Sequence, residues 1–175
     1  MFAPPALDVH YFPDAVPDAD AVLSYLTRQI TWLDRMASRR TASFGLPYDY
    51  SGQRYDPVPM PPPIAALADR AAALAGHAFN NCLCNLYETG LQSMGFHQDS
   101  YDGLVPTSQI AIVSLGATRV LHFRSLDLRH RAARPLAHGS ILLMSASTQR
   151  SWKHAVPRDR SAGLRISATF RNLAV

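Results

Sequence analysis

The stretch RISATFR, residues 165–171, alternates polar and apolar residues in the manner of a β-strand with two different faces. Its polar face carries four side chains, two of them arginines: Arg165, Ser167, Thr169 and Arg171. Its apolar face carries Ile166, Ala168 and Phe170. Two structures fit this alternation about equally well. One is a surface strand that shows its arginines to water, and the other is a barrel strand whose polar face points into a cavity that holds an anion.

Short β-type segments fill the chain from residue 79 onward, separated by Gly, Pro, Asp and Ser. In chain order they read FNNCLCNLY, SQIAIVSL, TRVLHFR, GSILLMS, KHAV and LRISATFR. A series of short strands without helices between them predicts an antiparallel sandwich or barrel.

Two helices and a loop-rich stretch are expected before these strands. The segment VPDADAVLSYLTRQITWLDRM predicts a helix after the N-cap Asp18, with apolar residues at helical spacing: Val22, Leu26, Ile30 and Leu33. The segment PIAALADRAAALAGHAF predicts a second helix through Ile64, Leu67, Ala71 and Leu74. Residues 37–63, between them, are expected to form a loop. We therefore expect a mainly β fold of the α+β class, with both helices packed outside, in a single domain over residues 1–175.

The composition limits the setting of this domain. The chain has 175 residues, with 17 Lys and Arg against 13 Asp and Glu, which gives a net charge of +4. Lys153 is its one lysine, and the planar fork of arginine suits phosphate and carboxylate groups. This balance permits a nucleic-acid partner without requiring one. Cys82 and Cys84 are expected to be small core residues in a reducing compartment.

The segment GFHQDSYDG, residues 95–103, puts His97 and Asp99 two positions apart. At a strand end, the two-residue period would bring both side chains to one face. A histidine from a distant strand would complete the two-histidine, one-carboxylate triad of non-haem Fe(II) oxygenases. The candidate third ligands downstream are His122, His130, His138 and His154. His154 is favoured because it precedes Arg165 by only eleven positions, which would place a metal ligand near an anion-binding arginine.

Six segments resemble the AlkB family of Fe(II)- and 2-oxoglutarate-dependent dioxygenases in their order and approximate spacing: NLY, HQD, SLGATRVLHF, LAHGSILLM, WKHAVPR and RISATFR. The resemblance runs from about residue 36 to the C-terminus. It implies a double-stranded β-helix (jelly-roll) core over residues 79–175, after helices and a nucleotide-recognition lid over residues 1–78. It also implies that Fe(II), 2-oxoglutarate and O2 are used, with His97, Asp99 and His154 as the iron ligands and catalytic residues.

The resemblance implies a binding site for 2-oxoglutarate as well, formed by Asn85, Tyr87, Arg165, Ser167 and Arg171. In this site Arg165 would form a salt bridge to the distal carboxylate. The usual final motif of the family is Arg-x-Asn-x-Thr-x-Arg, and here Ser167 stands in place of the asparagine. One hydrogen bond to the co-substrate is therefore expected to be shorter in reach or lost.

The segment SFGLPYDYSG resembles the lid that carries a base-stacking aromatic residue in repair members of the family. Tyr50 is the first choice for this residue and Tyr48 the second, and the alternative is that both tyrosines merely pack the loop. The arginines that flank this lid could meet phosphates: Arg39, Arg40 and Arg54.

Many repair members also have an acidic residue two positions after the iron-binding aspartate, where it accepts from the exocyclic amine of the base. Tyr101 occupies that position here, and Asp102 could take the role only through a bulge.

The resemblance implies oxidative demethylation of 1-methyladenine and 3-methylcytosine in DNA or RNA, which releases formaldehyde and succinate. The alternative is an oxygenase of the same fold that hydroxylates or demethylates a protein side chain or a small metabolite, and Tyr101 and Ser167 favour it. The sequence has no basic segment followed by an apolar run at its start and no stretch of eighteen apolar residues. A cytoplasmic protein that does not associate with membranes is therefore expected. It is also expected to be a monomer.

Overall fold

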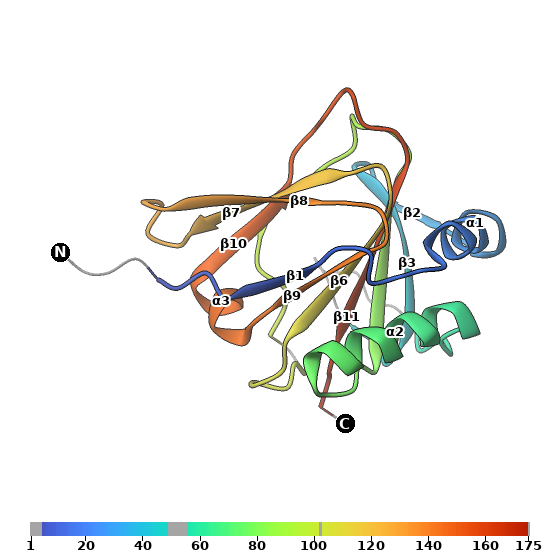
Figure 1. Ribbon diagram of the computed structural model, residues 1–175, viewed down its shortest axis with the longest axis horizontal. Helices are drawn as coiled ribbons and strands as arrows, with labels where there is room; N and C mark the ends of the chain where they lie inside the picture. The colour runs from blue at the N-terminus through green and yellow to red at the C-terminus, as the bar shows by residue number, and fades with distance from the viewer. Residues whose placement is uncertain (1–4, 49–55, 102, 175) are drawn as a thin grey trace.

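The structure is a computed structural model that describes residues 5–48, 56–101 and 103–174. Its strands form two antiparallel sheets (Figure 1). The larger sheet has the strand order β1 (Val9–Phe12), β9 (Ser140–Met144), β6 (Ile110–Gly116), β11 (Arg165–Arg171), β4 (Asn81–Tyr87), β3 (Arg39–Gly45), β2 (Leu33–Met36). The smaller sheet has the order β5 (Met94–His97), β10 (Trp152–Val156), β7 (Arg119–Ser125), β8 (Arg131–Leu136). Apolar side chains of both sheets pack into one cluster, which includes Ile112, Phe123 and Leu142. The predicted jelly-roll core is confirmed.

Two helices, α1 (Ala19–Gln29) and α2 (Pro62–Ala75), cover the side of the larger sheet that faces away from the smaller one (Figure 1). Their buried faces and the outer face of the sheet form a second hydrophobic cluster. The prediction that both helices pack outside is therefore confirmed. α2 ends where Gly76 takes φ 74°, a left-handed conformation that glycine favours, and donates its N–H to the carbonyl of Ala72. None of the described helices is long and apolar enough to cross a membrane.

The strand β11 lies in the middle of the larger sheet, between β6 and β4. Its apolar residues Ile166, Ala168 and Phe170 belong to the cluster under the helices. Its polar residues line a cavity between the two sheets: Arg165, Ser167, Thr169 and Arg171. Of the two structures that fit its alternation, the cavity-facing barrel strand is the one observed.

The expectations for the N-terminal half are partly wrong. The predicted loop over residues 37–63 contains β3, which pairs with β4 from Arg40 to Gly45. This cross-strand pairing outweighs the weak local strand signal of the segment. The first helix is shorter than predicted, because α1 ends at Gln29 and Leu33 begins β2. The elements β1, β8 and α3 (Ala146–Ser151) are short and were not expected from the sequence.

Candidate metal centre

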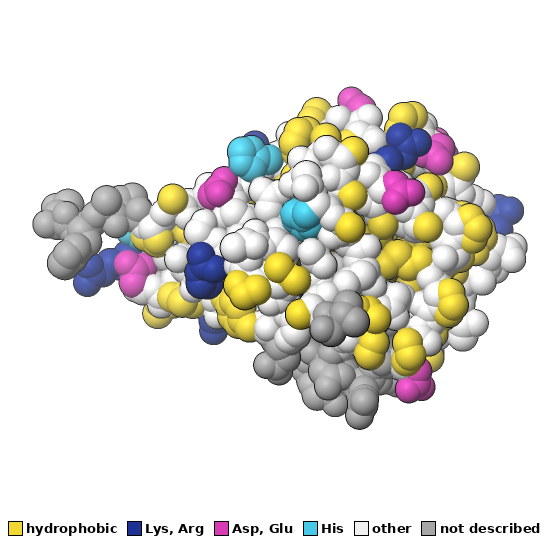
Figure 2. Space-filling model, turned by 90° about the horizontal axis from the view of Figure 1, so that it is seen from below, with side chains coloured by type: hydrophobic (Ala, Val, Ile, Leu, Met, Phe, Trp, Pro, Cys, Tyr) yellow, Lys and Arg dark blue, Asp and Glu magenta, His cyan; other side chains and the backbone are white. Residues whose placement is uncertain are grey.

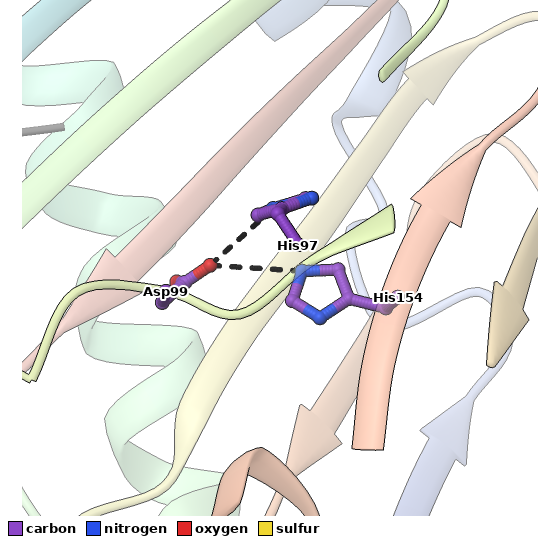
Figure 3. A group of neighbouring side chains, drawn as sticks. All are labelled: His97, Asp99 and His154. Atoms are coloured by element: carbon purple, nitrogen blue, oxygen red, sulfur yellow. Dashed lines mark ion pairs between the residues drawn. The ribbon is translucent and has the colours of Figure 1, made fainter. Parts of the chain in front are cut away.

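Three side chains meet between the sheets (Figure 3). His97 is the last residue of β5, and His154 lies in the middle of β10. The two strands pair so that these histidines are directly opposite each other, and both imidazoles project from the same face. Asp99 follows two residues after the end of β5. The structure thus brings the favoured third histidine to the His97–Asp99 pair.

The three side chains present their ligand atoms to one point. The Nε2 atoms of His97 and His154 each lie 3.6 Å from Oδ1 of Asp99. The three ligand atoms all lie within 4.8 Å of one another. One ion at about 2.1 Å from each nitrogen and oxygen can bridge such separations. Two imidazoles and one carboxylate form the donor set that suits Fe(II), so the residues fit the metal.

Neighbouring groups orient these ligands. Nδ1 of His97 lies 2.9 Å from the carbonyl oxygen of Gly95, a contact that favours the tautomer with a free Nε2 lone pair. Arg171 donates from Nε and Nη2 to Oδ2 of Asp99, at 2.8 and 2.5 Å. Gln149 donates from Nε2 to the backbone carbonyl of Asp99 at 2.9 Å. The aspartate therefore turns Oδ1 toward the histidines.

The surroundings of the triad lower the pKa values of both Asp99 and His154, which favours the binding of a cation. Burial raises the pKa of Asp99. The Arg171 guanidinium and a hydrogen bond with His97 lower this pKa by a larger amount, so it is held well below its usual range. Burial, together with the charge of His97, lowers the pKa of His154 to about 3. The carboxylate is thus ionised and His154 is neutral near pH 7, which are the forms that bind metal.

The cavity beside the triad contains a buried cation with free donors. Arg165 is 1% exposed, and its Nη2 donates to Oγ of Ser114 at 2.9 Å. Its Nε and Nη1 are buried and have no hydrogen-bond partner in the described parts of the chain. Burial lowers the pKa of Arg165 to about 10, so the group stays charged near pH 7. A buried guanidinium with two unused donors fits a carboxylate ligand.

The other predicted 2-oxoglutarate residues line the same cavity: Asn85, Tyr87, Ser167 and Arg171. Ser167 lies directly opposite Asn85 on one side and Ser114 on the other. Two of the predicted residues already have protein partners. Asn85 accepts a hydrogen bond from Nε of Arg39 at 2.7 Å, and Arg171 holds Asp99.

The predicted substrate residues are not gathered at one place. Tyr48 is 2% exposed, its ring lies 4.2 Å from the Arg171 guanidinium carbon, and its hydroxyl accepts from the amide of Ser100 at 2.8 Å. In this position it supports the loop that carries Asp99 and has no face open to a base. Tyr101 is 48% exposed and donates its hydroxyl to the carbonyl of Gln149 at 2.7 Å. The base-stacking choice Tyr50, and with it Arg54 and Asp102, lies outside the described residues.

The arginines placed beside the lid belong to a strand instead. Arg39 is 5% exposed and points to Asn85, so it cannot meet a phosphate in this conformation. Arg40 is half-buried and forms ion pairs with Asp34 at 2.7 Å and Glu88 at 3.3 Å. Both arginines differ from the prediction because they lie in β3, a segment that was predicted to be loop.

The remaining histidine candidates serve elsewhere. His138 accepts from the amide of Gly116 at 2.8 Å, which is the turn role expected for it. His122 lies on β7 between the buried residues Leu121 and Phe123, and its side chain therefore faces away from the cavity. The backbone carbonyl of His130 accepts from the amide of Ser125 at 3.0 Å, in the turn between β7 and β8.

Sequence reasoning missed two residues of the site. Ser114 is a polar residue in an otherwise apolar strand, IAIVSLG, and this contrast could have indicated that it belongs to the site. Gln149 lies on the short helix α3, where nothing in the local pattern marks it.

The family model for the 2OG-Fe(II) oxygenase superfamily matches residues 23–171. The chain is 34% identical over 179 residues to alpha-ketoglutarate-dependent dioxygenase alkB homolog 3 of Homo sapiens, covering 90% of this chain and 63% of that protein. It is 37% identical over 147 residues to DNA oxidative demethylase ALKBH2 of Mus musculus, covering 77% of this chain and 62% of that protein. The chain thus spans a little under two thirds of the length of these relatives.

The fold also matches the solved structure described as that of OsALKBH1. The TM-score is 0.74 at 15% sequence identity, with 98% of this chain and 100% of the other covered. At this level of identity the match shows the fold alone.

Proposed function

Because the chain belongs to the 2OG-Fe(II) oxygenase superfamily and is similar to AlkB homologues, we propose that it demethylates the alkylated nucleobases 1-methyladenine and 3-methylcytosine in DNA or RNA. The observation that carries the proposal is a single cavity lined by the His97–Asp99–His154 triad and by the buried Arg165.

The residues of the cavity would have two roles, metal binding and co-substrate binding. His97, Asp99 and His154 would hold Fe(II), and Arg165 would bind the distal carboxylate of 2-oxoglutarate through its two unused donors. Iron, 2-oxoglutarate and O2 together supply the oxidation, in which 2-oxoglutarate becomes succinate and CO2 and one oxygen atom enters a substrate C–H bond. An N-methyl group oxidised in this way becomes a hydroxymethyl amine, which releases formaldehyde and leaves the unmodified base.

A row of three cations on the smaller sheet favours a nucleic-acid substrate. Arg131 is directly opposite Arg124, which is directly opposite Lys153, so their side chains lie on one face. This is the outer face, because the flanking residues Phe123 and His154 are buried between the sheets. The four strands of this sheet contain no acidic residue.

Like charges directly opposite each other destabilise a sheet unless an anion lies over them. The guanidinium carbon of Arg124 also lies 4.2 Å from the centroid of the Phe96 ring. A basic side chain next to an aromatic ring suits the binding of a nucleic-acid strand. On the face shown in Figure 2, basic and acidic side chains are interspersed among apolar ones. Lys153 precedes His154 in β10, so its side chain lies on the face of the sheet opposite the triad.

The test is mass spectrometry of a 3-methylcytosine oligonucleotide incubated with the protein, Fe(II), 2-oxoglutarate and ascorbate under air. We expect the loss of one methyl mass with the wild type and none with His154→Ala. Succinate formation without any loss of mass would overturn the nucleobase substrate and favour the alternative, an oxygenase acting on a protein side chain or a metabolite. Formation of neither succinate nor the demethylated oligonucleotide would overturn the oxygenase itself.

The monomeric state and the cytoplasmic location stay proposals based on the sequence. Sedimentation of the purified chain tests the first, and fractionation of the cells that make it tests the second.

A further inference from the structure

Two buried arginines flank the ring of Tyr87. The guanidinium carbons of Arg119 and Arg165 each lie 5.5 Å from its centroid. All three side chains are only 1% exposed. Tyr87 and Arg165 line the cavity beside the metal centre, whereas Arg119, the first residue of β7, lies outside its lining. Any influence of Arg119 on the cavity therefore passes through or around Tyr87.

The positive charge of this pair is not balanced in the described parts of the chain. Neither arginine forms an ion pair there. Nη1 of Arg119, like Nε and Nη1 of Arg165, is buried and has no hydrogen-bond partner among the described residues. Among the described residues, Asp159 is the one carboxylate that acts on Arg119, and its Oδ1 accepts a hydrogen bond from Ser161 Oγ. Two buried cations with unused donors are costly to a protein unless an anion binds between or beside them.

Hydrogen bonds to neutral groups hold Arg119 in place despite the repulsion between its charge and that of Arg165. Its Nη2 donates to the carbonyl of Gln92 at 2.9 Å and to the carbonyl of Pro157. These bonds tie the start of β7 to the segment before β5 and to the end of β10. They use one terminal nitrogen and no negative charge, so they position the guanidinium without neutralising it.

We propose that Arg119 is a positioning residue of the 2-oxoglutarate site, which acts through Tyr87 and strengthens the hold of Arg165 on the distal carboxylate. The inference rests on the co-substrate part of the proposed function and is independent of the nucleic-acid substrate. A dicarboxylate is the ligand class that fits, because one end belongs at the metal and the other meets Arg165, whose positive potential Arg119 adds to from behind Tyr87. The contribution of Arg119 must then depend on the distal carboxylate of the ligand.

The test compares two ligands that differ in that group alone. The full chain, loaded with Mn(II) in place of Fe(II), is titrated with 2-oxoglutarate and with 2-oxopentanoate, which has a methyl group where the distal carboxylate stands. Binding is measured by calorimetry and by the ligand-induced shift of thermal unfolding, at concentrations high enough to detect the weaker acid. The variants are Arg119→Met, Arg119→Lys and the control Arg134→Met, which removes an exposed arginine of β8.

We expect Arg119→Met to weaken 2-oxoglutarate binding roughly ten-fold, about 1.4 kcal/mol, and to leave 2-oxopentanoate binding unchanged. Arg119→Lys should retain most of the affinity because it keeps the charge, and Arg134→Met should affect neither ligand. Equal losses for both acids, or no loss for either, would show a purely structural residue and overturn the inference. Should Arg119→Met fail to fold, Arg119→Gln gives the same comparison. If the wild type itself does not bind 2-oxoglutarate, the proposed function fails first.

Discussion

Arg171 and Asp99 form an ion pair that uses one carboxylate oxygen and leaves the other facing the two histidines. Nε and Nη2 of Arg171 take Oδ2 at 2.8 and 2.5 Å, and Oδ1 is left facing the Nε2 atoms of both histidines at 3.6 Å. The arginine therefore fixes both the charge and the direction of the metal-binding oxygen. The ring of Tyr48 packs against this guanidinium, 4.2 Å from its carbon, and supports its position.

We expect Arg171→Met to lower metal affinity about 10- to 100-fold, because the aspartate loses the partner that orients it. The metal-free variant should also lose about 3–5 kcal/mol of unfolding free energy near neutral pH, since a buried carboxylate is left unpaired. Co(II) titration and urea unfolding measure the two effects. Arg165→Met is the matched control, because it removes a buried arginine of the same strand without touching Asp99. Metal affinity that is equal in the two variants would contradict the role given to Arg171.

Gln149 connects α3 to the loop that carries Asp99 by three hydrogen bonds. Its Nε2 donates to the Asp99 carbonyl at 2.9 Å, and its own carbonyl accepts from Gln98 and Tyr101, both at 2.7 Å. Gln149→Ala should lower kcat roughly ten-fold through the loss of the side-chain bond and a looser loop, with the affinity for 2-oxoglutarate unchanged. Tyr101→Phe removes a single bond to the backbone and should have a smaller effect. Single-turnover assays and co-substrate titrations separate the two quantities, and an unchanged kcat in Gln149→Ala would show that its hydrogen bond to Asp99 does not affect the reaction.

The cation row provides a test of nucleic-acid binding. Replacing Arg124, Arg131 and Lys153 together by Gln should weaken oligonucleotide binding and flatten its salt dependence by about 0.7–0.9 log units per lost phosphate contact. A control variant with the same change in net charge replaces three basic residues elsewhere: Arg28, Arg70 and Arg160. Fluorescence anisotropy at several salt concentrations measures the slope. Equal slopes for the two variants would mean that net charge alone governs binding.

The sequence was most informative where strand periodicity and charge coincide. The alternation in RISATFR is strict, so the faces of β11 could be assigned once the strand was known to be internal. His154 was chosen among four histidines because it precedes Arg165 by only eleven positions, and the structure pairs it with His97 across β5 and β10. Which of the two environments the polar face meets depended on the sheet order, and sheet order is a long-range property that local pattern does not encode.

The residues that surround the site were harder to predict for the same reason. Arg39 read as a lid arginine because β3 carries few strand-forming residues, yet pairing with β4 turns it onto Asn85. Tyr48 read as a stacking residue, and its burial comes from the loop at Ser100, which is 52 positions away in sequence. These contacts join distant segments, so only the folded chain reveals them.

Ser167 offers a test of how the site tolerates its departure from the usual family motif. Ser167→Asn should tighten 2-oxoglutarate binding by about 1 kcal/mol, or about five-fold, because the longer amide can add one hydrogen bond to the co-substrate. Ser167→Ala, which removes the hydroxyl, should bind no more tightly than the wild type. Calorimetry on the Mn(II)-loaded chain measures both. Weaker binding in Ser167→Asn would show that the cavity has adapted to the smaller residue and has no room for asparagine.

Gly45 ends β3 at the point where the chain leaves the sheet toward Tyr48. It takes φ +81°, and a Cβ there would lie 2.1 Å from the carbonyl oxygen of Asn80. Gly45→Ala should therefore cost at least about 2 kcal/mol of unfolding free energy, from the left-handed backbone and from the clash with rigid backbone. For a domain of this size the melting temperature should fall by at least about 4 °C. Gly163→Ala is the control, since a Cβ at Gly163 meets nothing within 4 Å and its backbone is not left-handed, and it should leave the melting temperature within about 2 °C of the wild type. Equal melting temperatures for the two variants would show that the backbone at Gly45 can relax, and the path of the chain from β3 to Tyr48 would then be less constrained than the structure indicates.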